Sequence, residues 1–395
     1  MERLESLRDA PAVTPSLAAT AGYFLHLGAV GFGGPIALCA RMQRELVEER
    51  GWVRREAFLE GLALAQLAPG PLAAQLAIYL GWLRGGAIGA TLVGAAFVLP
   101  SFLIVLGLAA LYVRLGGMPW IQGAFYGIGA AVIAVIARGA FKLSRSTLRS
   151  DPLLWALCAM NAGTTLATER ELAWVFFASG AAVIVVRGAI PRSTSSTLRT
   201  LLPFSPQFAG GLHGVASSST LLQLAAFFTT AGAFVFGSGL AIVPFLRGGI
   251  VGDHHWLTET QFMDAVAVAM ITPGPVVITV AFIGYLVAGL AGATVAAAGV
   301  FVPCYFFVIL LAPFYRRIAA NRTLAAFVSG VTAASCGALI GAAIVLGRRA
   351  IHDLPTATIA ATAWLLLWGL RRLPEQFVLA AAAAVGLVVR AEPWR

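Results

Sequence analysis

Hydrophobic residues fill long uninterrupted runs of this chain, and the polar residues gather in short segments between the runs. Residues 87–113 and 121–140 form two such runs, and each is long enough to cross a bilayer, which takes roughly 20 residues of α-helix. Further apolar runs cover residues 17–40, interrupted at residues 31–35, and residues 152–167, 172–186, 221–246, 288–313, 324–346, 356–370 and 376–389. The pattern predicts an all-α polytopic membrane protein.

Two apolar runs contain the same interruption, the tripeptide Pro-Gly-Pro. Pro69-Gly70-Pro71 lies between apolar residues 57–68 and 72–83, and Pro273-Gly274-Pro275 lies between residues 261–272 and 276–286. Proline removes a backbone donor and clashes with the preceding helical turn, whereas glycine permits a sharp turn. Each run therefore predicts two half-helices broken at membrane depth, where non-helical backbone is tolerated only inside protein or along a wet cavity.

The two interruptions belong to a longer internal repeat. Glycine, proline, tryptophan and acidic residues recur at a nearly constant separation, 204 residues at first and 203 after one residue is dropped. The matched pairs include Gly33 and Gly237, Trp52 and Trp256, Glu60 and Asp264, Pro69 and Pro273, Gly81 and Gly284, and Pro100 and Pro303. We predict an internal duplication.

Composition supports the membrane assignment. Charged residues make up only 11% of the 395 residues, against about 25% in soluble domains, and hydrophobic residues make up 59%. The net charge is +10, and the basic residues cluster between apolar runs, as expected for loops at an anionic cytoplasmic leaflet. Nucleic-acid binding is the competing interpretation of a basic chain, but the sequence has no soluble domain to carry it. The first sixteen residues lack an apolar core, so no cleaved signal peptide is expected, and the four cysteines show no metal or disulfide spacing.

The distribution of arginine predicts the topology. If each Pro-Gly-Pro segment is a re-entrant hairpin that returns to its own side, the basic segments all fall in the cytoplasm; they are residues 41–56, 142–149, 187–220, 316–322 and 371–372. If each segment is instead a single broken crossing, the basic loop 142–149 moves outside. The hairpin gives five crossings per half, about ten in all, and an odd number makes the two halves an inverted repeat. Two features oppose this count: Arg348-Arg349 falls outside, and so does the N-terminus with its Arg3 and Arg8.

The same pattern divides the chain into three parts. Residues 1–186 form the first transporter repeat, and residues 221–395 form the second. Residues 187–220, rich in Ser, Thr, Gly and Pro, form a cytoplasmic linker between them.

The broken helices are the first candidate site. A half-helix that begins after Pro71 or Pro275 presents unpaired N–H groups and a partial positive charge, and two of them meeting near the midplane would bind an anion. The alternative is that the breaks are only kinks at a packing interface, and that the nearby glycine motifs only allow close helix packing. The candidate substrate-binding residues are Gly33, Gly34, Pro35, Gln66, Pro69, Gly70, Pro71, Gln75, Gly237, Ser238, Gly239, Thr272, Pro273, Gly274, Pro275 and Thr279.

Charged residues near the breaks form a second candidate group. Glu60 and Asp264 each lie nine residues before the first proline of a break, and a carboxylate in an apolar run is usually functional, here as a carrier of the driving proton. The alternative places them near the first turn of a half-helix, where they offset its dipole. Arg41, Arg84 and Arg247 border the broken segments and suit an oxyanion, because the guanidinium donates two parallel hydrogen bonds. Taken singly, each also fits a snorkelling anchor.

Catalysis is the contrasting class of function. The sequence contains no Ser-His-Asp order, no His-Glu-x-x-His motif and no nucleotide-binding loop, so we expect no enzyme, no metal site and no cofactor. A passive anion channel is a further alternative, although two inverted halves with broken helices suit alternating access better.

The motifs resemble those of the chromate ion transporter family. They are Phe32-Gly33-Gly34-Pro35, Gln66-Leu67-Ala68-Pro69-Gly70-Pro71, Phe236-Gly237-Ser238-Gly239 and Ile271-Thr272-Pro273-Gly274-Pro275, and the resemblance runs from Tyr23 to about Arg349. It implies a long, two-domain member that exports chromate across the inner membrane of a bacterium, by secondary transport coupled to the proton gradient. Its partners would then be chromate, protons and the lipid bilayer, with no nucleic acid; a homodimer is left open.

Two points limit what the resemblance implies. Sulfate is a structural analogue of chromate, so transport of sulfate or another oxyanion stays an alternative. Some members of the family carry polar and acidic residues directly after the first Pro-Gly-Pro, where this chain has Leu72-Ala73-Ala74. This difference leaves the backbone N–H groups and Gln75 as the candidate ligands.

Overall fold

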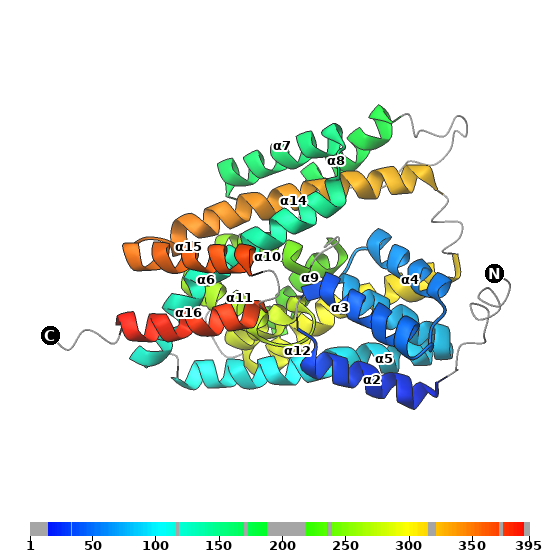
Figure 1. Cartoon of the computed structure of the whole chain (residues 1–395), viewed down its shortest axis with the longest axis horizontal. Helices are drawn as coiled ribbons and strands as arrows, with labels where there is room; N and C mark the ends of the chain where they lie inside the picture. Colours follow the sequence, from blue (N-terminus) through cyan, green and yellow to red (C-terminus); the bar gives the residue numbers. More distant parts are fainter. Residues whose placement is uncertain are drawn as a thin grey trace.

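The computed structural model describes residues 15–32, 34–115, 118–169, 173–187, 218–234, 239–314, 321–370 and 374–390, and the regular structure of these residues is entirely helical. This confirms the all-α prediction. Four of the described helical segments are long and apolar enough to cross a membrane; they cover 72–115, 120–148, 276–314 and 322–350. In Figure 1, helices α2, α3 and α4 (blue) gather at one end of the long axis and α15 and α16 (orange to red) at the other.

The helices follow one another in two similar series. The first contains α2 (Leu17–Val30), α3 (Gly34–Met42), the π-helix η1 (Gln43–Glu49), α4 (Arg55–Leu67), α5 (Leu72–Leu115), α6 (Pro119–Leu148), α7 (Pro152–Thr168) and α8 (Ala173–Val186). The second contains α9 (Ser218–Phe234), η2 (Gly239–Ala241), α10 (Ile242–Arg247), η3 (Gly248–Asp253), α11 (Glu259–Ile271), η4 (Val276–Ile278), α12 (Thr279–Leu311), η5 (Ala312–Phe314), α14 (Arg322–Ala350), α15 (Leu354–Gly369) and α16 (Glu375–Arg390).

Backbone details repeat between the series and support the duplication. Both contain a π-helix, η1 or η3, followed by a tryptophan whose backbone N–H donates to a carbonyl of that π-helix. Trp52 donates to the Leu46 carbonyl and Trp256 to the Ile250 carbonyl. Two non-helical residues interrupt α5 and α12 at matching places. Gly86 has φ 55° and ψ −141°, and its counterpart Gly289 has φ 60° and ψ −149°.

The first Pro-Gly-Pro segment is the tip of a helical hairpin. Helix α4 ends at Leu67 and α5 begins at Leu72, and the two pack so closely that a Cβ on Gly61 would lie 2.2 Å from Cδ1 of Tyr79. At the other end of the same pair, the Arg84 guanidinium donates to the Trp52 carbonyl. The chain therefore enters and leaves this segment at the same end, as a hairpin requires.

The interruption in α5 is a second reversal. A Cβ on Gly81 would lie 2.4 Å from the carbonyl oxygen of Gly89, so the parts of α5 before and after the interruption run side by side. In the second half, a Cβ on Gly284 would lie 2.3 Å from the carbonyl oxygen of Gly292. Small residues let the helix backbones approach this closely. The long apolar segment 87–113 predicted from the sequence is the part of α5 that follows the reversal.

The first apolar run differs from its prediction. We counted residues 17–40 as one membrane crossing, but α2 ends at Val30 and α3 starts at Gly34, whose φ of +74° favours glycine. Beyond this turn the chain runs back along α2, since the Arg50 guanidinium lies 5.1 Å from the Tyr23 ring centroid. The run is a second hairpin, so the prediction that residues 17–40 cross the membrane once was wrong. The Leu17 end of α2 lies at the same end of the molecule as the basic segment 41–56 (Figure 1).

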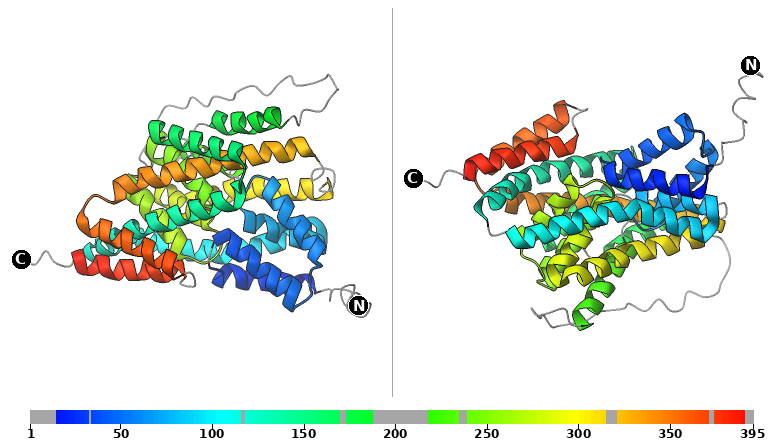
Figure 2. Two further views of the ribbon diagram at one scale, coloured as in Figure 1. Left: turned by 45° about the horizontal axis from the view of Figure 1, so that its top comes forward. Right: turned by 90° about the horizontal axis from the view of Figure 1, so that it is seen from below.

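The two halves share their interior. Helices α5 and α12 pack against each other along the long axis, as the right-hand view of Figure 2 shows. Buried side chains of α12, Cys304 and Val308, join the core formed by α2, α3, η1, α4 and the part of α5 up to Phe97. Contact between α5 and α12 brings each break against the opposite half.

Candidate functional site

The second break packs directly against the first half. The backbone N–H of Gly274 donates to the carbonyl oxygen of Gly31 at 2.7 Å. A Cβ on Gly274 would lie 1.8 Å from Oγ of Ser101, which itself donates to the carbonyl oxygen of Gly28 at 3.1 Å. Gly274 therefore sits between α2 and α5, at the point where α2 ends.

The first break makes the matching contact with the second half. A Cβ on Gly70 would lie 3.2 Å from Cβ of Cys304 on α12. Ser101 and Cys304 are counterparts in the repeat, separated by 203 residues, and each follows the proline inside its helix, Pro100 or Pro303. Each break thus contacts the same position of the opposite half, which is the arrangement of a pseudo-twofold pair.

Gln75 occupies the inside of the first break. Its side chain is fully buried, and Nε2 donates to the carbonyl oxygens of Pro69 at 2.7 Å and Ala68 at 3.2 Å. These bonds satisfy carbonyl groups that the end of α4 leaves free. The other amide atom, Oε1, is buried without a hydrogen-bond partner among the described residues. Thr279, the counterpart of Gln75, instead donates its hydroxyl to the Val276 carbonyl at 2.8 Å.

The break also supplies backbone donors. Helix α5 begins at Leu72, and the first N–H groups of a helix have no partner within it. They carry a partial positive charge, which favours an anion nearby. The start of the second half-helix is a 3₁₀ turn, η4, before α12 begins at Thr279. The arrangement can therefore offer backbone N–H groups from two directions, with one buried acceptor, Gln75 Oε1, beside them.

The other predicted binding residues lie around this junction, with exceptions. Pro71, Pro273 and Pro275 are buried, and so is Thr272, whose hydroxyl donates to the Ala269 carbonyl at 3.1 Å. Gly34, Pro35 and Pro69 are half-buried, and Gly239 lies against Val277 of its own half. Gln66 is exposed, so the structure does not bring it into the junction. Gly33, Gly237 and Ser238 lie outside the described residues.

The three predicted arginines are engaged away from the breaks. Arg41 Nε contacts Glu45 Oε1 at 2.7 Å, and Arg84 donates to the Trp52 carbonyl at the base of the first hairpin. Arg247 is buried, and its Nε contacts Glu259 Oε1 at 2.7 Å. In this arrangement the positive charge available at the junction comes from the helix start and not from these guanidinium groups.

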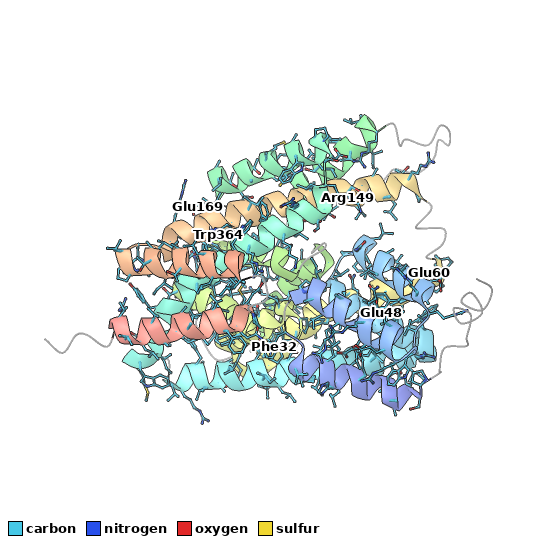
Figure 3. The ribbon with its side chains drawn as sticks, viewed as in Figure 1. Phe32, Glu48, Glu60, Arg149, Glu169 and Trp364 are labelled. Carbon is cyan, nitrogen blue, oxygen red and sulfur yellow. The ribbon has the colours of Figure 1, made fainter. Side chains whose placement is uncertain are left out.

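The sequence did not reveal the cluster of charges around Arg247. Glu259 also contacts Arg349 at 2.8 Å, and Glu169 contacts both Arg349 and Arg247, the latter at 3.5 Å. We call these residues, Glu169, Arg247, Glu259 and Arg349, the four-charge cluster. It joins the end of α7 in the first half to α10, α11 and α14 in the second, and Figure 3 shows Glu169 and Arg149 at opposite ends of α7.

The two predicted carboxylates differ in their surroundings. Asp264 is buried in α11 and accepts a hydrogen bond from Tyr112 Oη of the first half at 2.7 Å. Glu60, its counterpart on α4, is half-buried. Tyr112 was not among the predicted residues, because a tyrosine near the end of an apolar run is equally typical of a membrane interface.

Comparisons with a family model and with individual proteins point to the same family. The model of the chromate transporter family matches residues 18–185 and again residues 222–387, which agrees with the two halves of the repeat. A chromate transport protein of Cupriavidus metallidurans is 53% identical over 93% of this chain and 91% of its own length. A probable chromate transport protein of Synechococcus elongatus is also 53% identical, over 93% of this chain and 94% of its own length.

A chromate transport protein of Pseudomonas aeruginosa is more distant, at 31% identity over 93% of this chain and 91% of its own. No solved structure matches the chain.

Proposed function

The chain belongs to the chromate transporter family, a family of transporters and not of enzymes, and on that premise we propose that it exports chromate from the cytoplasm in exchange for protons. It is a multi-pass membrane protein, and we place it in the inner membrane of a bacterium. The substrate rests on the relatives that are 53% identical and are named for chromate transport. The direction and the coupling proton rest on the resemblance of its motifs.

The observation that carries the proposal is the meeting of the two Pro-Gly-Pro breaks. Gly274 N–H bonds to the Gly31 carbonyl, and Gly70 contacts Cys304, so both breaks reach one junction between the halves. Transporters with duplicated halves bind anions where the positive ends of broken helices face each other. We place the chromate site at this junction, with the N–H groups after Pro71 and Pro275 as its ligands. Gln75 joins them only if its amide N–H groups leave the Pro69 and Ala68 carbonyls, because its unpaired Oε1 is an acceptor, as the anion is. Because each break is packed against the opposite half, binding requires the junction to open.

The halves are proposed to be inverted. The base of the first hairpin, with Trp52 and Arg84, lies at the end of the molecule from which α5 leaves, and α5 and α6 return the chain to that end at Asp151. Helix α7 then runs to Glu169 at the opposite end, where the four-charge cluster holds Glu259 at the base of the second hairpin. The two hairpins thus enter from opposite ends. This arrangement of the two hairpins takes the place of the sequence argument for inversion, which relied on an odd number of membrane crossings in each half.

The proposed inversion also accounts for Arg349, an arginine that falls on the outer side against the positive-inside bias. Arg349 lies at the end opposite the basic segment 41–56, but it contacts Glu169 and Glu259. The positive-inside bias concerns the arginines and lysines of the loops. Because two carboxylates neutralise its guanidinium, Arg349 at the outer end counts less against the predicted topology than an unpaired arginine would. The domain division, with repeats at 1–186 and 221–395 joined by residues 187–220, stays part of the proposal.

Sulfate is the second candidate substrate. Sulfate and chromate are both tetrahedral dianions, and backbone N–H groups distinguish them poorly. The test is uptake of labelled chromate and labelled sulfate into inverted membrane vesicles whose interior is made acidic. We expect chromate to accumulate with the pH gradient, to collapse with the gradient, and to persist in excess sulfate. Accumulation of sulfate in place of chromate, or of neither, would contradict the proposal.

A further inference from the structure

The side chain of Asp264 is buried, which is unusual for a carboxylate. Every residue of α11 from Phe262 to Ala269 is buried, Asp264 among them with 6% of its surface exposed. Among the described residues, its side chain makes one hydrogen bond, from Tyr112 Oη at 2.7 Å, and no ion pair. A carboxylate without a countercharge is costly in an apolar interior, and inside a membrane it marks a functional site, of which a proton path is one kind.

The charged groups around α11 are engaged elsewhere or exposed. Helix α11 packs against η4, α5, α6, α12 and α16. Arg138 of α6 contacts Glu375 of α16, Tyr126 of α6 donates to Asp353 at 2.6 Å, and Arg390 lies over the Tyr126 ring. The other described titratable groups on these helices are Tyr79, Arg84 and the exposed Arg114 on α5, Lys142 and Arg145 on α6, and Tyr285, Cys304 and Tyr305 on α12. Tyr112 is the polar partner that faces Asp264.

The bond between Asp264 and Tyr112 joins the two halves. Tyr112 belongs to the last turns of α5, and its ring packs edge-on against Phe125 at 5.5 Å and Phe282 at 5.3 Å. These rings shield the carboxylate from water. Any motion that separates α11 from the end of α5 breaks this bond and exposes Asp264 at the same moment.

The repeat carries the same pair of groups a second time. Glu60 is the counterpart of Asp264, and Tyr315, outside the described residues, is the counterpart of Tyr112, 203 residues away. The surroundings of the two carboxylates differ, because α4 leaves Leu59 46% exposed whereas α11 is enclosed. Two equivalent halves in unequal surroundings can exchange those surroundings, which is how inverted repeats produce alternating access.

From this geometry we propose that Asp264, bonded to Tyr112 across the two halves, carries the proton that is exchanged for the transported anion. The proton binds the carboxylate on the outer side, crosses as the carboxylic acid, and is released to the cytoplasm as the anion leaves. No bond other than O–H is formed or broken. The inference rests on the proposed function, because it assumes a transported anion.

Substitution of Asp264 by Asn tests the inference. The amide oxygen can still accept from Tyr112, but the side chain no longer binds and releases a proton. In inverted vesicles we expect D264N to lose pH-driven accumulation of chromate. It should keep the exchange of labelled for unlabelled chromate without a gradient, and the rate of that exchange should no longer vary with pH. Y112F should shift the pH dependence of exchange without abolishing it.

The control is a second pair of a carboxylate and a tyrosine, outside the proposed proton path. Asp353 also accepts from a tyrosine, Tyr126, but at the exposed end of α15, where hydrogen bonds from Thr356 and Tyr126 lower the pKa of its carboxyl to about 2. D353N and Y126F should therefore accumulate chromate as the unmodified chain does. Gradient-driven accumulation that survives in D264N would overturn the assignment of the proton, while the proposed function would stand. Failure of the unmodified chain to accumulate or exchange chromate would instead overturn the proposed function.

Discussion

Glycine is required at both breaks by the backbone conformation and by the close approach of neighbouring side chains. Gly70 has a φ of +136° and Gly274 a φ of +95°, conformations that other residues rarely adopt. The space is also closed, most severely at Gly274, where an added Cβ would meet Ser101 at 1.8 Å. The two requirements coincide at the place where we propose that backbone donors approach the anion.

We expect G274A to abolish chromate uptake, because the new methyl group would push the second break away from Ser101 and Gly28. The measurement is uptake into inverted vesicles that contain equal amounts of the inserted protein. G107A is the control, since a Cβ at Gly107 on α5 meets no atom within 4 Å. Equal loss of uptake in G274A and G107A would contradict a specific role of the junction in chromate transport.

Sequence reasoning found the two breaks but not the residues that they contact. Proline and glycine in an apolar run reveal a break directly, because each acts on its own backbone. Ser101 and Cys304 were missed, since their role comes from packing against the opposite half, and one sequence does not show which distant residues meet. The arginines were assigned to the anion, but the structure pairs Arg41 and Arg247 with glutamates instead.

At the scale of elements, the four-charge cluster fixes the base of the second hairpin. Arg247 is 8% exposed, and its Nε lies 2.7 Å from Glu259. Removing one partner of a buried ion pair leaves an uncompensated charge and costs about 3 kcal/mol, whereas breaking an exposed pair costs less than about 1 kcal/mol.

E259Q is therefore expected to lower the unfolding temperature of the purified protein by several degrees. E49Q breaks the exposed contact between Glu49 and Arg44, 3.4 Å apart, and should leave the unfolding temperature nearly unchanged. The two temperatures can be compared by thermal unfolding in the same detergent. Equal shifts would mean that the cluster does not hold the hairpin.

The elements were predictable to different degrees. The broken segments and the long helices followed from the apolar runs, and the return of the first hairpin followed from the distribution of arginine. The turn between α2 and α3 was predicted only as an interruption. Its reversal depends on Tyr23, Arg50 and Trp52 packing together, and such contacts are not visible in hydropathy.

At the scale of the whole molecule, two halves inverted as we propose would explain several observations together. They place the tips of both hairpins at one junction and let each break contact the same position of the other half. They also place Asp264 and Glu60 in unequal surroundings. Our account of transport, with one anion site and one proton carrier between the halves, depends on this inversion.

Equivalent positions of the two halves provide the most direct test. Glu49 and Asp253 are both exposed, are separated by 204 residues, and end the π-helices η1 and η3. Single cysteines at these positions can be labelled in intact cells and in inverted vesicles with a thiol reagent that does not cross membranes. The four native cysteines are buried, so the unmodified chain should show little labelling.

If the halves are inverted, E49C reacts only in inverted vesicles and D253C reacts only in intact cells. Labelling of both positions from the same side would contradict the inversion, and with it the meeting of two opposed breaks at one anion site.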